Sequence, residues 1–197
     1  GQTQPLVDAA ERAGLRALWF RVAKEGLATR RAVAAEPVVI DYGHEDTLPR
    51  ERGPSRAGGV LSKAFVEDAI ADALRPAGDP RRIDAVVTGP ISKESWSMAG
   101  FRWPGHTELF AARCKAAHHT MLFESPRLRV ALATAHLALM DVRNVLTIGK
   151  VFDPIELGAA HCRRLGIDGP RVAVCGLNPH AGEQGLFGDE ERRVISP

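Results

Sequence analysis

The sequence predicts an α/β protein, because short apolar segments typical of buried strands alternate with segments typical of amphipathic helices. Residues 128–134 are almost continuously apolar, as in a central parallel strand that is covered on both faces. Residues 62–74 instead place their apolar side chains at helical spacing. Strands separated by helices imply mostly right-handed crossovers between parallel strands, and therefore a sheet with helices packed against it.

The first half of the chain is expected to alternate helices and strands. In chain order these are a helix at residues 6–13, a strand at 37–41, a helix at 62–74, a strand at 83–88 and a helix at 93–99. Gly14 and Gly100 stand where two of these helices are expected to end, a position that glycine favours. Residues 43–59 are polar and rich in glycine and proline, and they predict a loop.

The second half is expected to add further helices and strands. They are a helix at residues 108–118, strands at 120–123 and 128–134, a helix that starts near residue 154, and a strand at 171–175. Thr107 is expected to cap the first of these helices through its hydroxyl. Asp153 is expected to cap the second, with Pro154 at its first position and Glu156 completing a pattern similar to a capping box. Gly166 would end that helix.

The composition is that of an ordinary soluble globular protein, with 45% hydrophobic and 25% charged residues among 197. The net charge is only +2 and the basic residues are scattered, which argues against nucleic-acid binding. No apolar run reaches the roughly 20 residues that span a bilayer, and no secretion signal is present. The 3 cysteines have no CxxC spacing, so free thiols and a cytoplasmic location are expected. Cropping at one or both ends is also expected, because the chain lacks a starting methionine and stops just after the expected start of a helix.

Two segments share one design, in which a strand delivers a histidine just beyond its carboxyl end. Residues 129–136 end at His136, and residues 171–180 end at His180. Ligands bind at that edge of open α/β sheets, and neutral histidine is a common ligand of divalent transition metals. The matching placement favours a shared metal or substrate, while hydrogen-bonded histidines in ordinary loops remain the alternative.

The loop that carries His180 gathers several ligating groups. Asn178 and Glu183 flank the histidine, and Gly182 and Gly185 permit close approaches of the backbone. Such a concentration is unusual for a plain surface turn, so a binding site is favoured. The glutamate is interpreted either as part of that site or as a solvated charge.

Two further segments contain groups that suit an anion. Gly105-His-Thr-Glu108 enters a helix whose free N-terminus would attract phosphate or carboxylate, and His106 could add a hydrogen bond; an ordinary capped helix start is the alternative. Val87-Thr-Gly-Pro-Ile-Ser-Lys93 ends with a lysine that could hold the same kind of anion, or that is simply a surface group. No GxGxxG, GxxxxGK[ST] or GxSxG is present, which argues against the standard nucleotide loops and serine hydrolases.

Taken together, four motifs in this order resemble the 4-hydroxythreonine-4-phosphate dehydrogenase family of pyridoxal phosphate biosynthesis. They are Val87-Thr-Gly-Pro-Ile-Ser-Lys93, Gly105-His-Thr-Glu-Leu-Phe110, Ala133-Thr-Ala-His-Leu-Ala-Leu-Met-Asp141 and Val174-Cys-Gly-Leu-Asn-Pro-His-Ala-Gly-Glu183. The resemblance runs from about residue 60 to the end of the chain, and before that only the general pattern matches.

This resemblance implies a three-layer α/β/α subunit with two lobes, similar to the isocitrate and isopropylmalate dehydrogenases. Residues 1–100 would form part of the first lobe, and residues 101–197 part of the second, with dimerisation and metal-site elements. The resemblance further implies a homodimer whose active site lies in the cleft between the lobes and is completed by the partner subunit.

The same resemblance implies roles for individual residues. His136 and His180 would bind a divalent metal, with zinc expected first and magnesium, manganese or cobalt as alternatives. A third metal-binding histidine would lie beyond residue 197. His106 and Thr107 would contact the phosphorylated substrate.

The reaction implied is oxidation of the secondary alcohol of 4-hydroxythreonine 4-phosphate by NAD, or NADP, with loss of carbon dioxide from the resulting β-keto acid. Lys93 and Asp141 would be catalytic residues. No cofactor-binding residue is assigned, because most of those contacts are expected beyond residue 197.

Three alternatives remain open. A related dehydrogenase could act on 4-phospho-threonate or 4-phospho-erythronate, because the retained motifs contact features that all these substrates share. A non-catalytic truncated remnant could keep the fold and bind metal weakly without turnover. A metallohydrolase is disfavoured, since no HExxH or other complete ligand set is present.

Overall fold

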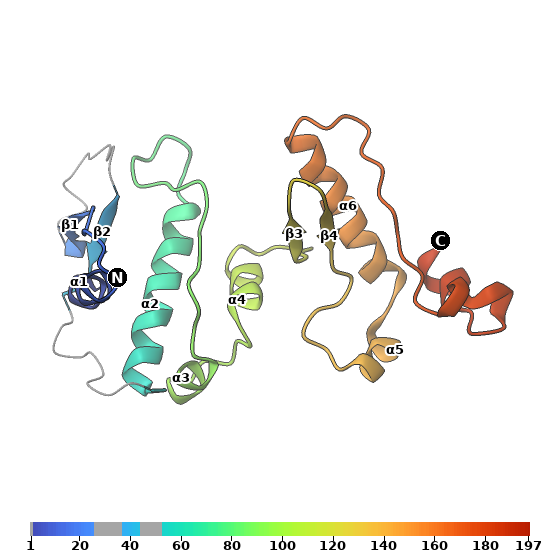
Figure 1. The fold of residues 1–197 in the computed structure, drawn as a ribbon, viewed down its shortest axis with the longest axis horizontal. Helices are drawn as coiled ribbons and strands as arrows, with labels where there is room; N and C mark the ends of the chain where they lie inside the picture. Colours follow the sequence, from blue (N-terminus) through green and yellow to red (C-terminus); the bar gives the residue numbers. More distant parts are fainter. Residues whose placement is uncertain (1, 26–36, 44–52) are drawn as a thin grey trace. The chain divides into compact units, whose positions relative to one another are not determined.

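The computed structural model describes residues 2–25, 37–43 and 53–197, and the chain divides into two compact units (Figure 1). Unit 1 comprises residues 1–115 and unit 2 comprises residues 116–197. Both units contain helices and strands, so the predicted α/β class is confirmed. The three-layer, two-lobed arrangement and the lobe boundary near residue 100 stay predictions.

Unit 1 begins with a helix and two strands. Helix α1 spans Thr3–Arg12, and strands β1 (Phe20–Ala23) and β2 (Val38–Asp41) pair in parallel. The helix and the second strand were both expected from the sequence and are confirmed. Gly14 follows α1 with a φ of 65°, the left-handed conformation that ends many helices.

A buried carboxylate joins these elements. Asp41, at the end of β2, is only 2% exposed, and its Oδ2 accepts a hydrogen bond from Thr3 Oγ1 at 2.6 Å. Gly43 N donates to Oδ1 at 3.0 Å, and Arg21 Nε of β1 lies 2.6 Å from Oδ2. The Thr3 hydroxyl, the Gly43 amide and the arginine together hold the pKa of Asp41 below its usual range. The charge is buried without being left unpaired.

The hydrophobic core of unit 1 lies between three helices, α2 (Arg56–Ala73), α3 (Lys93–Met98) and α4 (His106–Arg113). Its buried members are Val66, Ile70, Trp96 and Leu109. The largest of them, Trp96, is 1% exposed and donates from Nε1 to Ser62 Oγ at 3.0 Å. The indole therefore contributes apolar area to the core while its one polar atom is paired.

Helices α2 and α3 come into backbone contact at Gly59, near the N-terminal end of α2 (Figure 1). A Cβ at this position would lie 2.0 Å from the Ser95 carbonyl oxygen, so only glycine fits. The predicted loop at 43–59 is wrong for its last residues, because Ser55 caps α2 by accepting from Gly58 N at 3.1 Å. Residues 44–52 of that loop lie outside the described residues.

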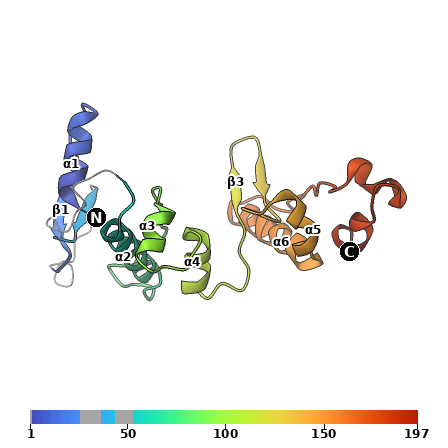
Figure 2. The ribbon, with the colours of Figure 1, turned by 90° about the horizontal axis from the view of Figure 1, so that it is seen from below.

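Unit 2 consists of a β-hairpin, a long helix and several short helical segments. Strands β3 (Leu122–Glu124) and β4 (Arg129–Ala131) pair in antiparallel fashion, and helix α6 (Ile148–Arg164) packs beside them (Figure 2). His161 Nε2 of the helix lies 2.6 Å from Glu124 Oε2 of the hairpin. The short segments are η3 (Leu139–Asp141), α5 (Val142–Val145), η4 (Pro179–Gly185) and η5 (Glu191–Ile195).

Three strand predictions need correction. The strand expected at 128–134 is limited to residues 129–131 and belongs to a hairpin, not to a central parallel sheet. Residues 83–88 and 171–175 form no strand in the described part of the chain. An apolar run becomes a strand only where a neighbour pairs with its backbone N–H and C=O groups, and the described residues supply no such neighbour here.

The start of α6 also differs from the prediction. Thr147 is its N-cap, with Oγ1 accepting from Lys150 N at 3.2 Å, and Pro154 lies inside the helix. Asp153 is therefore not a cap, and its carboxylate instead lies 2.9 Å from His118 Nδ1. Gly166 follows the helix with a φ of 80°, as predicted. Within the described ranges, no helix has both the length and the apolar composition needed to cross a bilayer.

Replacing Gly59 with alanine should destabilise unit 1, because the added methyl group would have to displace the Ser95 carbonyl. Overpacking of this kind costs about 1–3 kcal/mol in the free energy of unfolding. Urea denaturation followed by far-ultraviolet circular dichroism, which reports on the helices of both units, measures the loss. Gly158→Ala in α6 is the control, since its methyl group would meet Ala131 Cβ at an ordinary 3.9 Å and helix propensity favours alanine. Equal losses in the two variants would contradict the role of Gly59.

Candidate functional site

The site residues predicted from the sequence divide between the two units. Unit 1 contains Lys93, His106 and Thr107, and unit 2 contains His136, Asp141 and His180. Within each unit, the neighbouring side chains and the local backbone determine how these groups are held.

Helix α4 begins at His106, two residues earlier than predicted, and Thr107 is not its N-cap. The cap position is taken by Gly105, which has an extended backbone and no side chain to accept from the first N–H groups. Thr107 is instead the second residue of the helix. The N-terminus of α4 is therefore free of a side-chain cap, which is the condition under which a helix end attracts an anion.

His106, the first residue of α4, is held by aromatic packing. Its ring meets the Trp96 ring edge to face, with centroids 5.6 Å apart, and stacks on Phe110 at 6.2 Å. This half-buried position lowers the pKa of His106, because burial disfavours the charged imidazolium. Near neutral pH the ring is therefore mostly neutral, with one N–H donor and one acceptor nitrogen.

The two predicted catalytic residues are both exposed. Lys93 is the first residue of α3, directly after Ser92, whose Oγ accepts from Ser95 N at 3.1 Å and caps the helix. Asp141 is the last residue of η3. In the described residues neither charged side chain has a hydrogen bond or an ion pair. The catalytic assignment of both residues stays a prediction.

The two predicted metal ligands share a backbone conformation that is uncommon for residues with side chains. The φ angle is 54° at His136 and 52° at His180. This left-handed region costs about 1–2 kcal/mol for a residue other than glycine. Such residues cluster at binding and catalytic sites, which is compatible with a functional role of both histidines, although Lys115, Ala181, Glu183 and Gln184 share the conformation.

The chemistry of the two imidazoles suits a metal ion. Both side chains are exposed, and in the described part of the chain neither makes a hydrogen bond or an ion pair. The same residues contain no group of three or more His, Cys, Asp and Glu side chains that could hold a metal ion. A protein site usually supplies at least three ligands. The assignment of His136 and His180 as two metal ligands, with a third histidine beyond residue 197, stays a prediction.

His180 opens a turn whose backbone is left-handed over five successive residues, 180–184. The φ angles in this turn range from 40° to 81°, and of its residues Gly182 is buried. Ala181 N donates to Asn178 O at 3.1 Å at the start of the turn, and Phe187 N donates to Gly182 O at 3.1 Å at its end.

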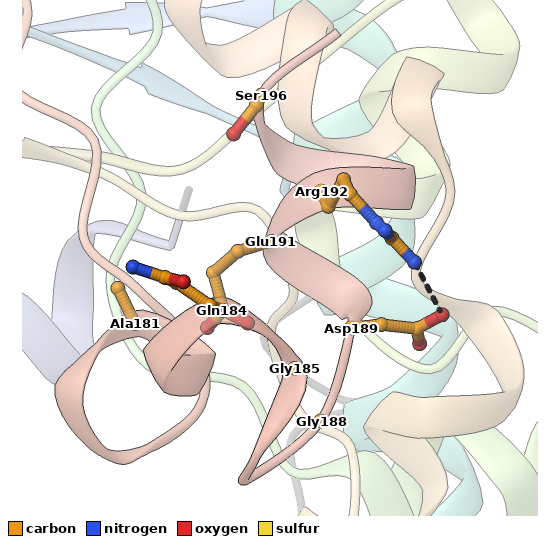
Figure 3. Close-up of a pocket in the computed structure, with 8 residues that line it drawn as sticks. All are labelled: Ala181, Gln184, Gly185, Gly188, Asp189, Glu191, Arg192 and Ser196. Atoms are coloured by element: carbon orange, nitrogen blue, oxygen red, sulfur yellow. Dashed lines mark ion pairs between the residues drawn. The ribbon is translucent and has the colours of Figure 1, made fainter.

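Glu191, which no sequence motif identified, anchors the segment that enters this turn. Its Oε1 accepts from Leu177 N at 2.8 Å and Asn178 N at 2.6 Å, and its Oε2 accepts from Asn178 Nδ2 at 3.0 Å. The backbone and side-chain donors of Asn178 are the main reason that the pKa of Glu191 falls to about 2. Figure 3 shows the Glu191 side chain extending from its helix toward the turn that carries Ala181 and Gln184.

Comparison with known proteins supports the resemblance found in the sequence. Residues 14–197 match the profile of the family described as pyridoxal phosphate biosynthetic protein PdxA. A 4-hydroxythreonine-4-phosphate dehydrogenase from Desulfosudis oleivorans is 43% identical over 145 residues, which cover 73% of this chain and 41% of the relative. A D-threonate 4-phosphate dehydrogenase from Pectobacterium atrosepticum is 40% identical over 160 residues, which cover 81% of this chain and 48% of the relative.

A solved structure shows the same relationship. The crystal structure of 4-hydroxythreonine-4-phosphate dehydrogenase from Klebsiella pneumoniae matches with a TM-score of 0.81 and 29% sequence identity, over 100% of this chain and 58% of that one. The chain spans about half the length of the curated relatives that it matches. The predicted resemblance is confirmed.

The His106 ring should titrate with a midpoint below 6.5, and an NMR titration of its carbon-bound ring proton measures this. Phe110→Ala, which opens the packing on one face, should move the midpoint toward the ordinary value of about 6.5. Because the pKa is lower in the folded state, the unfolded chain takes up the proton first as the pH falls. The stability contributed by the packed ring is therefore complete above about pH 6.5 and is lost as the pH drops through the folded pKa. A midpoint at or above 6.5 would contradict this account.

Proposed function

The chain belongs to the PdxA family of pyridoxal phosphate biosynthetic proteins, and we propose that the complete protein is a metal-dependent dehydrogenase that oxidises 4-hydroxythreonine 4-phosphate with NAD. The match of residues 14–197 to the family profile carries this proposal. The names of the relatives support the reaction class. Oxidation of the secondary alcohol would give a β-keto acid, which then loses carbon dioxide.

His136 and His180 are proposed to supply two ligands of a divalent metal. This proposal is supported by the local structure at each residue, because both imidazoles are exposed and both residues have a left-handed backbone conformation. Zinc is proposed first because imidazole nitrogen suits it, with magnesium, manganese or cobalt as alternatives. When bound, such an ion would polarise the alcohol oxygen of the substrate.

His106 and Thr107 are proposed to bind the substrate phosphate. The uncapped N-terminus of α4 offers backbone N–H groups that point out of the helix. The mostly neutral His106 ring can add one N–H, and the Thr107 hydroxyl in the same turn can add one O–H. Lys93 and Asp141 are proposed as catalytic residues because they occupy matching motif positions, and both side chains are exposed.

A second candidate substrate is D-threonate 4-phosphate. A relative with that activity in its name is 40% identical over 81% of this chain, close to the 43% over 73% found for a 4-hydroxythreonine-4-phosphate dehydrogenase. Both substrates carry a phosphate and a secondary alcohol, so the proposed contacts of His106 and Thr107 serve either. The phosphate of 4-phospho-erythronate would be bound in the same way, which makes it the third substrate to test.

The family resemblance also supports a cytoplasmic homodimer with a shared active site. NAD is proposed as the hydride acceptor, with NADP as the alternative, and no residue of this chain is assigned to it. A non-catalytic remnant of the same fold is the competing proposal. It predicts weak metal binding and no NAD-dependent turnover with any phosphorylated hydroxy acid.

Replacing His136 or His180 with alanine in the complete protein should lower both metal content and turnover. Each variant loses a proposed metal ligand, and even the loss of a group that supports a ligand typically costs about 10- to 100-fold. Metal content after dialysis and the rate of NADH formation are the two measurements. His119→Ala is the control, because His119 is an exposed histidine of the same unit outside the proposed site. Normal metal content in both ligand variants would refute the assignment.

His106→Ala should mainly raise the KM for the phosphorylated substrate. A hydrogen bond to a charged group contributes about 1.5–3 kcal/mol, which corresponds to roughly 10- to 100-fold. Steady-state kinetics with 4-hydroxythreonine 4-phosphate, D-threonate 4-phosphate and 4-phospho-erythronate measure this effect and rank kcat/KM among the three. An unchanged KM would remove His106 from the phosphate site, and no turnover with any of them would favour the non-catalytic proposal.

A further inference from the structure

The left-handed turn at residues 180–184 needs stabilisation from outside itself. Four of its five residues carry side chains, and each of these costs about 1–2 kcal/mol in this conformation. Two backbone hydrogen bonds close its far end: Leu186 N donates to Glu183 O at 3.2 Å, and Phe187 N donates to Gly182 O. At the near end, which carries His180, Ala181 N donates to Asn178 O at 3.1 Å, and the segment that contains Asn178 is held from outside the turn.

Glu191 holds the segment that enters this near end. One of its carboxylate oxygens accepts both main-chain N–H groups of Leu177 and Asn178, the residues that lead through Pro179 into His180. The other oxygen accepts from the Asn178 side chain. Hydrogen bonds to a carboxylate are stronger than neutral ones, and this carboxylate belongs to a residue that is only 9% exposed. The orientation of the chain entering the turn is thereby fixed.

Glycines allow the same carboxylate to approach the inside of the turn. A Cβ at Gly182 would lie 2.9 Å from Glu191 Oε2 and 2.6 Å from Gly188 O. A Cβ at Gly176 would lie 3.5 Å from Glu191 Oε1 and 3.2 Å from Ala181 Cα. The carboxylate is therefore packed between the backbone at Gly176, which precedes His180, and the backbone at Gly182, which follows it.

We propose that Glu191 is a positioning residue for metal binding, in that its carboxylate fixes the backbone that carries His180. This inference rests on the proposed function, in which His180 is a metal ligand. A ligand whose Cα is already held in place loses less conformational freedom when it binds. The adjacent Glu190 differs from Glu191 in its contact with residues 177–180. Its Oε2 accepts from the Asn178 side chain, at 2.8 Å, and not from a main-chain N–H group of this segment.

The test compares Glu191→Gln with Glu190→Gln in the complete protein. Both changes remove one negative charge from adjacent residues. Both oxygens of Glu191 accept hydrogen bonds from Leu177 or Asn178. In Glu191→Gln, one of these oxygens becomes an NH₂ donor that faces another donor, so at least one hydrogen bond is lost in either orientation of the amide. Titration of the metal-free proteins with Co²⁺, followed by visible absorption, measures metal affinity and ligand geometry together. Thermal melting of the same metal-free samples reports separately on the fold.

Glu191→Gln should bind Co²⁺ about 10- to 100-fold more weakly and with an altered spectrum, as expected when support for a ligand is lost. Glu190→Gln should resemble the parent protein. Parent-like affinity and spectrum in Glu191→Gln, or an equal loss in Glu190→Gln, would overturn the inference. If Glu191→Gln does not fold, Glu191→Asp keeps the charge but shortens the side chain, and parent-like affinity in that variant overturns the inference equally.

His180→Ala separates this inference from the proposed function. If His180→Ala keeps the Co²⁺ affinity of the parent, the ligand assignment itself fails, and the inference fails with it. If His180→Ala loses affinity while Glu191→Gln keeps it, the ligand assignment stands and only the positioning role of Glu191 is refuted.

Discussion

The Cα of Gly59 lies against the Ser95 carbonyl, and this backbone contact allows the close packing of α2 and α3 on which the core of unit 1 depends. It brings Trp96 deep enough into the core for its indole N–H to reach Ser62. The same indole packs against the His106 ring and helps to exclude water from it. A glycine that has no chemical role of its own thus places the first residue of α4, and with it the proposed phosphate site.

Unit 2 positions its histidine in a different way. Hydrogen bonds from main-chain N–H groups to the Glu191 carboxylate hold the segment before His180, and no apolar core surrounds the imidazole. A polar anchor of this kind is directional, and it leaves the ring open to a ligand. His106 shows the opposite arrangement, because aromatic packing half-buries its ring and lowers its pKa. The two proposed roles therefore use histidine in two states, as an open ligand and as a neutral hydrogen-bond donor.

Local signals explain which parts of the fold the sequence predicts. Helix ends at Gly14, Gly100 and Gly166 are predictable because a left-handed residue after a helix favours glycine wherever it occurs. The apolar runs at 83–88 and 171–175 predict strands that do not form, since pairing depends on a neighbour that a run of residues does not specify.

The candidate site divides in a similar way between what the sequence predicts and what it does not. The motif positions single out His106 and His180 as chemically suited residues. The role of Glu191 escapes notice, because it depends on main-chain N–H groups 13 and 14 residues earlier, which no side-chain pattern marks. The left-handed backbone at His180 is also not predictable from the sequence, because glycine is the residue that normally signals this conformation.

The left-handed turn also constrains the order in which unit 2 can fold. Unfolded chains rarely populate this region of backbone space at residues with side chains, so the turn cannot form early from local preference alone. The carboxylate of Glu191, whose hydrogen bonds hold the segment before the turn, belongs to a later part of the chain than His180. We therefore expect the histidine to reach its final geometry only once the following helix has docked. If His180 binds a metal as proposed, metal capture would complete the folding of this segment and would not be the event that starts it.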